Sequence, residues 1–151
     1  MSPEILFTLA FPLAAPFWAL MILAPTWRVT ERVIASPLIA VPPALVYALA
    51  VLPGFATVFA AVANPTAAGV AALLATPAGV AAGWAHFIAF DLFVGRWAYL
   101  DARERGIHPL VMAPVLVLTI LLGPLGFLAY LAVLATARRT VLTRDGAEAS
   151  P

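Results

Sequence analysis

The chain has 151 residues, of which 64% are hydrophobic and 10% are charged, and its formal net charge is +1. Soluble domains carry about a quarter charged residues. The composition therefore indicates a single integral membrane domain. The balanced charge gives no basic surface of the kind that nucleic acid requires, so we expect no nucleic-acid partner.

The residue types that are absent exclude several chemistries. All eight basic residues are Arg, and the chain has neither Lys nor Cys. Without Lys, no Schiff base to retinal or pyridoxal phosphate can form. Without Cys, there is no disulfide, no thiolate metal site and no covalent haem attachment. His86 and His108 are the only histidines, so one chain cannot supply an all-histidine iron centre of three or four ligands.

Hydropathy predicts four membrane-spanning helices, and the first two lie in the N-terminal third. The first runs from about Ile5 to Ala24. Its start lacks a positively charged region and its length exceeds that of a signal peptide, so we expect it to be retained. A short polar loop over residues 26–32 leads to the second helix, residues 37–52. Pro53-Gly54 ends this helix or bends it sharply.

Residues 54–77 are apolar but interrupted by proline. Asn64-Pro65 and Thr76-Pro77 bracket a short helix predicted from Thr66 to Ala75. A helix of this length is too short to span, which favours an interfacial or re-entrant segment. A fifth span from Phe55 to Leu74 is the alternative.

The third predicted span runs from Pro77 to about Leu100, and the fourth from Pro109 to Ala135. Gly123-Pro124 interrupts the fourth helix and frees the carbonyl of Ile120. The expected fold is an all-α integral membrane protein with four transmembrane helices and a short interfacial or re-entrant segment between the second and third. Residues 1–137 form this transmembrane domain, and residues 138–151 form a polar tail with frayed structure.

Four spans would place the polar tail on the side of the membrane opposite the two polar loops. Arg28, Arg32, Arg103 and Arg105 lie in or near those loops, whereas the tail holds Arg138, Arg139 and Arg144. If Arg96 reaches toward the loop side, the count is five against three. Because arginine accumulates on the cytoplasmic side, this count favours cytoplasmic loops.

The third predicted span holds three ionisable residues at lipid depth, His86, Asp91 and Arg96. One Asp or Arg at a helix centre costs roughly 2.5–3.5 kcal/mol on insertion scales. Such residues are functional candidates by default. At about 100° per residue, Asp91 lies on a different face of the helix from His86. Aromatic residues of the same helix would supply apolar walls: Trp84, Phe90, Phe93 and Trp97.

Depth along the helices predicts which residues meet. Counted from the loop ends at about 1.5 Å per residue, Asp91 lies roughly 14 Å deep and His86 roughly 21 Å deep. Thr119 and Tyr47 fall near the level of Asp91, and Gly123 falls near that of His86. We therefore expect Asp91, Thr119 and Tyr47 to meet, and His86 to face the break in the fourth helix.

Each candidate also has a purely structural interpretation. Arg96 can reach the interface or pair with Asp101. Asp91 can bond to Thr119 or Tyr47 as a polar link between helices. His86 can be a satisfied interior histidine, and the aromatic residues can serve packing alone.

A metal centre fits the spacing poorly. His86 and Asp91 lie about 140° apart around a helix, whereas helical metal ligands usually follow an i, i+4 spacing. Two axial haem ligands would have to approach closely, but His108 lies in a loop at the end of the helix. His108, which precedes Pro109, is expected to be an interfacial or capping residue. We predict no metal site and assign no cofactor.

The motifs around these residues resemble those of the ABA4-like family. They are Trp84-x-His86-x4-Asp91-Leu-Phe-x2-Arg96-x4-Asp101, then His108-Pro109 and Gly123-Pro124-x-Gly126. This family of small integral membrane proteins is named after a plant plastid protein required to make neoxanthin from violaxanthin. The resemblance covers most of the chain and implies a four-span protein that acts on, or supports, carotenoid chemistry.

Two functions from different classes follow. The first is a membrane enzyme acting on a carotenoid or related polyene. Neoxanthin-type chemistry, an isomerisation, needs one acid and one base; Asp91 would donate the proton and His86 accept it. Arg96 or Tyr47 would orient a polar end group. Oxidative cleavage would need a metal that the sequence does not obviously supply. The substrate-binding candidates are Tyr47, Trp84, Phe90, Phe93, Trp97 and Thr119.

The second is a non-catalytic carotenoid- or retinoid-binding membrane partner of a separate enzyme. A transporter is a more distant third, because no inverted repeat accompanies the broken helices. The expected partners are a hydrophobic polyene and membrane lipid, with a homo-oligomer or a partner enzyme left open. Arg-only, Ala- and Pro-rich composition favours a bacterial inner membrane.

Overall fold

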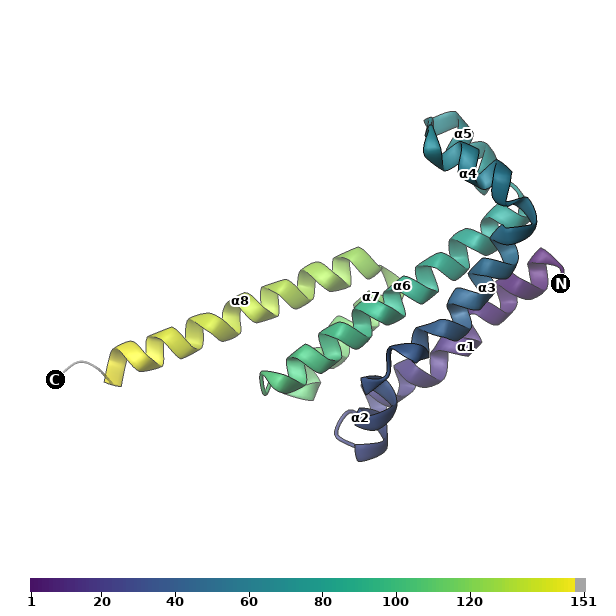
Figure 1. Cartoon of the computed structure of the whole chain (residues 1–151). Helices are drawn as coiled ribbons and strands as arrows, with labels where there is room; N and C mark the ends of the chain where they lie inside the picture. Colours follow the sequence, from purple (N-terminus) through teal and green to yellow (C-terminus); the bar gives the residue numbers. More distant parts are fainter. Residues whose placement is uncertain (149–151) are drawn as a thin grey trace.

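The computed structural model describes the backbone of residues 1–148 and the side chains of residues 1–137. Most of the described residues are helical, and none of them forms a strand. The prediction of an all-α protein is therefore confirmed for the described part. In chain order the helices are α1 (Pro3–Leu23), α2 (Arg28–Ala35), η1 (Pro37–Ala40), α3 (Val41–Val51), η2 (Leu52–Gly54), α4 (Phe55–Ala63), α5 (Ala67–Leu74), α6 (Pro77–Glu104), α7 (Pro109–Leu121) and α8 (Gly123–Glu148) (Figure 1).

Three helical segments within the described residues are long and apolar enough to cross a membrane. They are Pro3–Leu23, Pro37–Ala63 and Pro77–Glu104. At 1.5 Å per residue the shortest is about 31 Å long, which matches a hydrocarbon core of about 30 Å. These segments correspond to the first three predicted spans.

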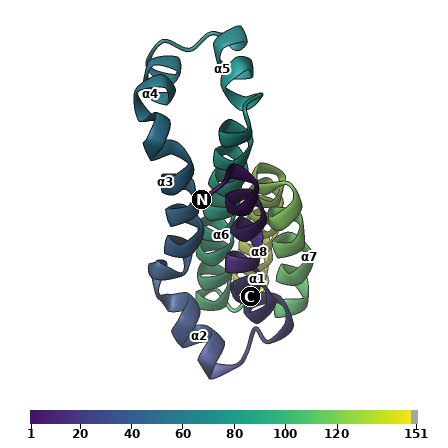
Figure 2. The ribbon, with the colours of Figure 1, turned by 90° about the vertical axis from the view of Figure 1, so that its right-hand side faces the viewer.

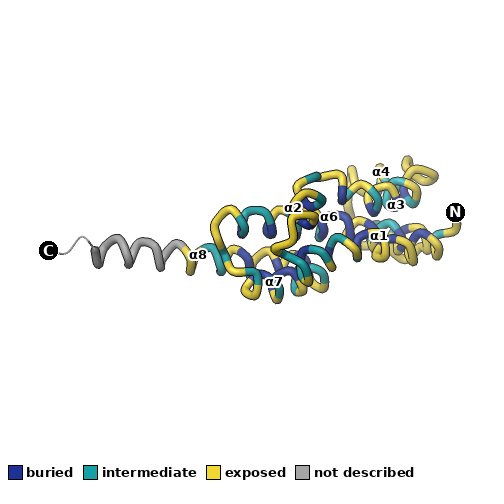
Figure 3. The backbone as a smooth tube through the Cα atoms, turned by 90° about the horizontal axis from the view of Figure 1, so that it is seen from below, coloured by how far each residue is buried: buried dark blue, intermediate teal, exposed yellow. Residues whose placement is uncertain are grey.

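The central helix is α6, which packs against α1, α3 and α7. Buried positions gather where these helices meet, whereas α4 is largely exposed (Figure 3). Ala14 of α1 and Ala85 of α6 are fully buried, and a Cβ on Gly95 of α6 would overlap the Trp18 indole of α1. Small residues are needed here because helices in lipid associate through close backbone packing.

The helix starts follow local rules that the sequence states directly. Proline stands in the first turn of α1, α6 and α7, where its missing N–H costs nothing. The Thr76 hydroxyl accepts a hydrogen bond from the Gly79 amide at 3.0 Å, capping α6. His108 caps α7, because its Nδ1 accepts from the Leu110 amide at 3.2 Å. The capping interpretation of His108 is thus confirmed.

The polar segment expected as a loop over residues 26–32 is largely helical. Arg28–Ala35 forms α2, with Thr30 and Ile34 buried on one face. Arg28 and Arg32 are exposed on the opposite face. The loop prediction is wrong because these eight residues are amphipathic, and burial of one face against the bundle stabilises a helix too short to persist alone.

The second span does not end at Pro53-Gly54. The chain passes through the 3-10 turn η2 and continues as α4, so the apolar helical segment extends to Ala63. The short helix predicted after Thr66 is present as α5, capped by the Thr66 hydroxyl. A single helix over Phe55–Leu74 is not formed, because Asn64-Pro65 separates α4 from α5 (Figure 2). Whether this segment is interfacial or re-entrant stays a prediction.

The fourth transmembrane helix, predicted over Pro109–Ala135, is not confirmed. Helix α7 ends at Leu121, and α8 begins at Gly123 and runs back beside α7 as a hairpin (Figures 1 and 2). Leu122 lies outside helical geometry, at φ −148° and ψ 67°. Pro124 lacks an N–H and its ring would clash with the carbonyl four residues earlier. The expected interruption is therefore a complete reversal of direction.

The C-terminal residues continue α8 rather than beginning a new element. Its backbone is helical to Glu148. Residues 149–151 of the predicted polar tail lie outside the described residues, as do the side chains from residue 138 onward.

Candidate functional site

A large cavity lies between α1, the middle of α6 and the turn that joins α7 to α8. Its volume is about 890 Å³, and its walls are mostly apolar. The lining residues are Phe11, Trp84, His86, Phe87, Ile88, Phe90, Asp91, Val94, Ile120, Leu121, Leu122, Gly123, Pro124 and Phe127. Non-helical backbone within a membrane is tolerated where it lines a cavity or is covered by protein, and the α7–α8 turn meets that condition here.

Asp91 lies at the midpoint of α6 and faces the α7–α8 turn. Its carboxyl group is so close to Gly123 that a Cβ on Gly123 would overlap it. Asp91 is partly buried, and its side chain has no hydrogen-bond partner among the described side chains and backbone. The carboxyl group can therefore bond to a molecule in the cavity.

His86 lies on the opposite edge of the cavity, next to α3. Its ring stacks on Phe90 with the centroids 4.7 Å apart, and it lies 5.6 Å from the Tyr47 ring. The imidazole is exposed, and in the described part of the chain it forms no hydrogen bond. Both ring nitrogens are thus available to a ligand.

The two ionisable residues flank an aromatic strip on α6. At about 100° per residue, Phe87 and Phe90 lie between His86 and Asp91 around the helix. Both phenylalanines are exposed and line the cavity. Trp84 stacks on Phe7 of α1 with the centroids 5.5 Å apart, so it closes one end of the strip. The result is an apolar groove with one carboxyl and one imidazole at its edges.

The structure gathers some of the predicted site residues and separates others. His86, Asp91, Trp84 and Phe90 line the cavity. The other predicted site residues do not: Tyr47, Phe93, Arg96, Trp97 and Thr119.

Arg96 is held by the end of α2. Its Nε donates to the Ile34 carbonyl at 2.7 Å, and its Nη2 donates to the Ala35 carbonyl. Arginine commonly satisfies the free carbonyls at a helix C-terminus in this way. Arg96 therefore fixes α2, instead of pairing with Asp101 or reaching the cavity.

The expected meeting of Asp91 with Thr119 and Tyr47 does not occur. Thr119 is buried, donates to the Val115 carbonyl at 2.8 Å, and lies where a Cβ of Gly126 would be. It therefore packs α7 against α8. Tyr47 approaches His86 instead. Depth alone could not reveal this, because the rotation of each helix decides which residues of one level meet.

Trp97 and Phe93 also lie away from the cavity. The Trp97 ring packs edge-on against Tyr130, with centroids 5.3 Å apart, and lies 5.9 Å from Phe127. It therefore supports α8 beside α6. Phe93 is exposed on the outer surface.

The sequence analysis did not select several cavity residues. Phe11 comes from α1 and Phe127 from α8. The Gly123-Pro124 pair was the one available signal, because a helix break at lipid depth needs a protein or cavity surface beside it. Nothing in the sequence distinguished Phe11 from the other aromatic residues of α1.

No group of three or more His, Cys, Asp and Glu side chains that could hold a metal ion occurs among the described residues.

The chain was compared with models of known protein families. Residues 5–130 match the model of the family described as ABA4-like, ABA DEFICIENT 4-like. This range includes the whole cavity and all of its lining residues. No curated protein and no solved structure matches the chain significantly.

Proposed function

The chain belongs to the ABA4-like family, and from that premise we propose that it is a membrane enzyme acting on a carotenoid or related polyene. The observation that carries the proposal is the pair His86 and Asp91. Both lie on a helix long and apolar enough to span a membrane, both line one apolar cavity, and neither forms a hydrogen bond with the described residues. Membership of the family suggests the class of substrate, and the cavity contains the acid and base groups that the proposed reaction needs.

The groove suits a long apolar substrate with a polar end group. Phe87 and Phe90 present aromatic faces along α6, and Trp84 and Phe11 border the same space. Binding sites for small molecules are typically lined by apolar side chains with a few polar groups that fix orientation. Here the polar groups would be Asp91 and His86.

The proposed reaction is an acid–base isomerisation. Protonated Asp91 donates its proton to an epoxide oxygen as the carbon–oxygen bond breaks, which leaves a hydroxyl group. His86 removes a proton from a nearby carbon, and the electron pair of that C–H bond forms a new carbon–carbon double bond. One proton enters the substrate and one leaves, so the product is an isomer. Burial favours the neutral form of a carboxyl group, which supports its role as an acid. Positioned acids and bases contribute about 10²–10⁴-fold in rate.

A non-catalytic carotenoid- or retinoid-binding partner of a separate enzyme is the second candidate. The observation that favours it is the exposure of His86 and Phe90 on one side of the cavity. An open groove can present a bound polyene to another protein. This function uses the same walls but needs no proton transfer.

The deciding experiment expresses the protein in a carotenoid-producing bacterial host and profiles pigments and retinoids by chromatography with mass detection. Wild type is compared with Asp91→Asn and His86→Ala. We expect a new product with wild type and its loss in both variants. The host membrane is chosen because we place the protein in a bacterial inner membrane.

Two matched variants control for the chemical changes themselves. Glu4→Gln makes the same carboxyl-to-amide change at an exposed residue of α1, and His108→Ala removes the other histidine, which caps α7. Both should retain the product. Unchanged pigments that co-purify equally with wild type and Asp91→Asn would support the binding partner and refute the enzyme.

A further inference from the structure

The α7–α8 hairpin enters and leaves the bundle at the same end. Helix α7 has 13 residues and is therefore about 20 Å long, less than the roughly 30 Å hydrocarbon core. Its turn meets Asp91, which lies at the middle of α6. The hairpin thus reaches the middle of the bundle without crossing it (Figure 1).

Helix α8 returns to the end of α6 that carries the polar loop. Tyr130 of α8 is fully buried and donates a hydrogen bond to the Asp101 carboxylate near the end of α6. Asp101 also accepts from Arg105 at 2.7 Å. Tyr130 lies seven residues past the turn at Gly123, so the chain beyond Ala137 continues outward from this end.

This return gathers the positive charge of the chain at one end. The two polar segments hold Arg28, Arg32, Arg103 and Arg105, and Arg96 bonds to the carbonyls of α2. The remaining three arginines follow Ala137 in sequence. All eight basic residues therefore belong to the end formed by α2, the α6–α7 loop and the distal part of α8, which we name the arginine end.

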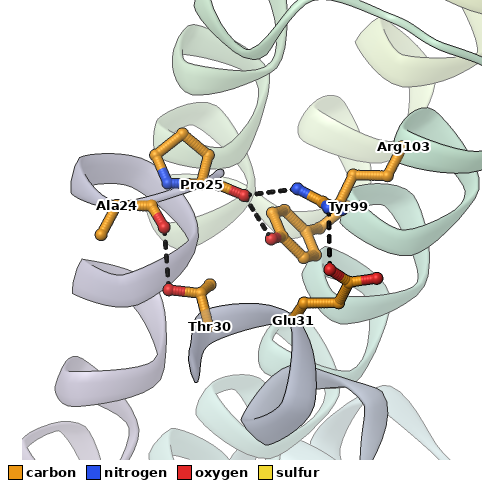
Figure 4. Close-up of polar contacts among 6 residues, drawn as sticks. All are labelled: Ala24, Pro25, Thr30, Glu31, Tyr99 and Arg103. Carbon is orange, nitrogen blue, oxygen red and sulfur yellow. Dashed lines mark hydrogen bonds and ion pairs between the residues drawn. The ribbon is translucent and has the colours of Figure 1, made fainter. Parts of the chain in front are cut away.

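Helix α2 presents two of these arginines outward. The Pro25 carbonyl accepts from Tyr99 and from Arg103, each at 2.7 Å, and Arg103 pairs with Glu31 at 3.1 Å (Figure 4). These contacts fix the turn before α2 and the side of α2 that bears Glu31.

The outward face of α2 carries positive charge that no described carboxylate neutralises. Arg28 and Arg32 are exposed one turn apart, and neither forms an ion pair with a described residue. Trp27, which precedes them, is 55% exposed. Tryptophan beside arginine is the composition found at the level of lipid head groups.

We infer that the arginine end lies against the cytoplasmic leaflet, that Arg28 and Arg32 contact its anionic phospholipid head groups, and that α7–α8 is a re-entrant hairpin. With four spans, five arginines would lie on one side of the membrane and three on the other. With a re-entrant hairpin, all eight lie on the same side. Arginine in short loops sets orientation, and arginine near the membrane surface is attracted to the anionic lipids of the cytoplasmic leaflet. The inference is independent of the proposed enzymatic function.

Cysteine labelling can test the orientation directly, because the natural chain contains no cysteine. Single variants Ser2→Cys, Asn64→Cys, Glu104→Cys and Ala147→Cys are treated with a membrane-impermeant maleimide in intact spheroplasts and again after permeabilisation. We expect Ser2→Cys and Asn64→Cys to react in intact spheroplasts. Glu104→Cys and Ala147→Cys should react only after permeabilisation.

Two labelling outcomes would overturn the inference. If Ala147→Cys reacts from outside while Glu104→Cys does not, residues 109–137 cross the membrane as a fourth span. If Glu104→Cys reacts from outside, the arginine end faces away from the cytoplasm. Neither outcome changes the test of Asp91 and His86, which measures products.

The lipid contact is tested by purifying the protein into nanodiscs of phosphatidylcholine with a minority of phosphatidylglycerol, then measuring retained lipid by native mass spectrometry. The double variant Arg28→Gln, Arg32→Gln should retain severalfold less phosphatidylglycerol than wild type. Arg105→Gln is the matched control, because this guanidinium already pairs with Asp101. Equal retention in the double variant and wild type would refute the contact.

Discussion

The ionisable residues in the two halves of α6 differ in whether the protein itself provides their hydrogen-bond partners. In the half next to the polar loop, Arg96, Asp101 and Arg103 all bond to other parts of the protein. In the half nearer Pro77, together with the midpoint, His86 and Asp91 have no described hydrogen-bond partner and line a cavity. Helix α6 therefore carries charged residues that hold the bundle together near one end, and two ionisable groups that remain available to a ligand in the rest of the helix.

This contrast shows that the presence of a charge in a membrane helix does not by itself identify a functional residue. Insertion costs are similar for Asp and Arg, yet Arg96 is satisfied by the carbonyls of α2 and Asp91 is not satisfied. A charged residue in a membrane helix is a stronger functional candidate when the protein itself supplies no hydrogen-bond partner for it.

The largest effect should come from closing the space in which Asp91 sits. Gly123→Val places a side chain where the carboxyl group now lies. Displacing a catalytic group by about 1 Å can cost 100-fold in rate, so product formation per folded protein should fall about 100-fold by the same reasoning. Pigment profiling in the carotenoid-producing host measures this loss.

Gly54→Val is the control for that variant, because nothing lies within 4 Å of its Cβ position. Product formation should stay near the wild-type level. If Gly123→Val were as active as Gly54→Val, the position of the Asp91 carboxyl group would not matter for activity. Asp91 would then not be the acid of the proposed reaction.

The next effect concerns the packing that brings α1 against α6. Gly95→Ala adds a methyl group that overlaps the rigid Trp18 indole, and overpacking of this kind costs about 1–3 kcal/mol. Unfolding by increasing fractions of dodecyl sulfate should show the loss. Gly83→Ala, whose Cβ would be 3.5 Å from Leu74, should change stability by less than about 1 kcal/mol.

Arg96→Gln tests whether Arg96 has a structural role alone. The variant loses the donors that hold the Ile34 and Ala35 carbonyls, and a hydrogen bond from a charged group contributes about 1.5 kcal/mol or more. We expect lower stability and faster proteolysis near α2. Product formation per folded protein should stay at the wild-type level. If the variant folds fully but forms less product, Arg96 takes part in the reaction.

The smallest effect should come from Tyr130→Phe. It removes the hydroxyl that donates to Asp101 while Arg105 still bonds to that carboxylate, so the cost should be about 1 kcal/mol. Dodecyl sulfate unfolding of the single variants and of the double variant with Asp101→Asn would measure the coupling. Purely additive effects would mean that this bond does not hold α8 in place.

Much of the fold could be predicted from local sequence. Hydropathy placed the first three spans, and proline and threonine marked the starts of α5 and α6. The occurrence of His86 and Asp91 on one helix identified two residues of the cavity beside the α7–α8 turn. These features depend on residues close together in the chain, or on transfer of a helix into lipid, so each could be evaluated without knowing its neighbours.

The sequence by itself thus determined the class of protein, the central helix and the two candidate groups on it. Only the tertiary structure decided that residues 109–137 turn back at Leu122, that Arg96 bonds to α2, and that Thr119 faces α8 rather than Asp91. A proline marks where a helix breaks but not the direction in which the chain continues. That direction, and the rotation of each helix, follow from packing between segments far apart in sequence.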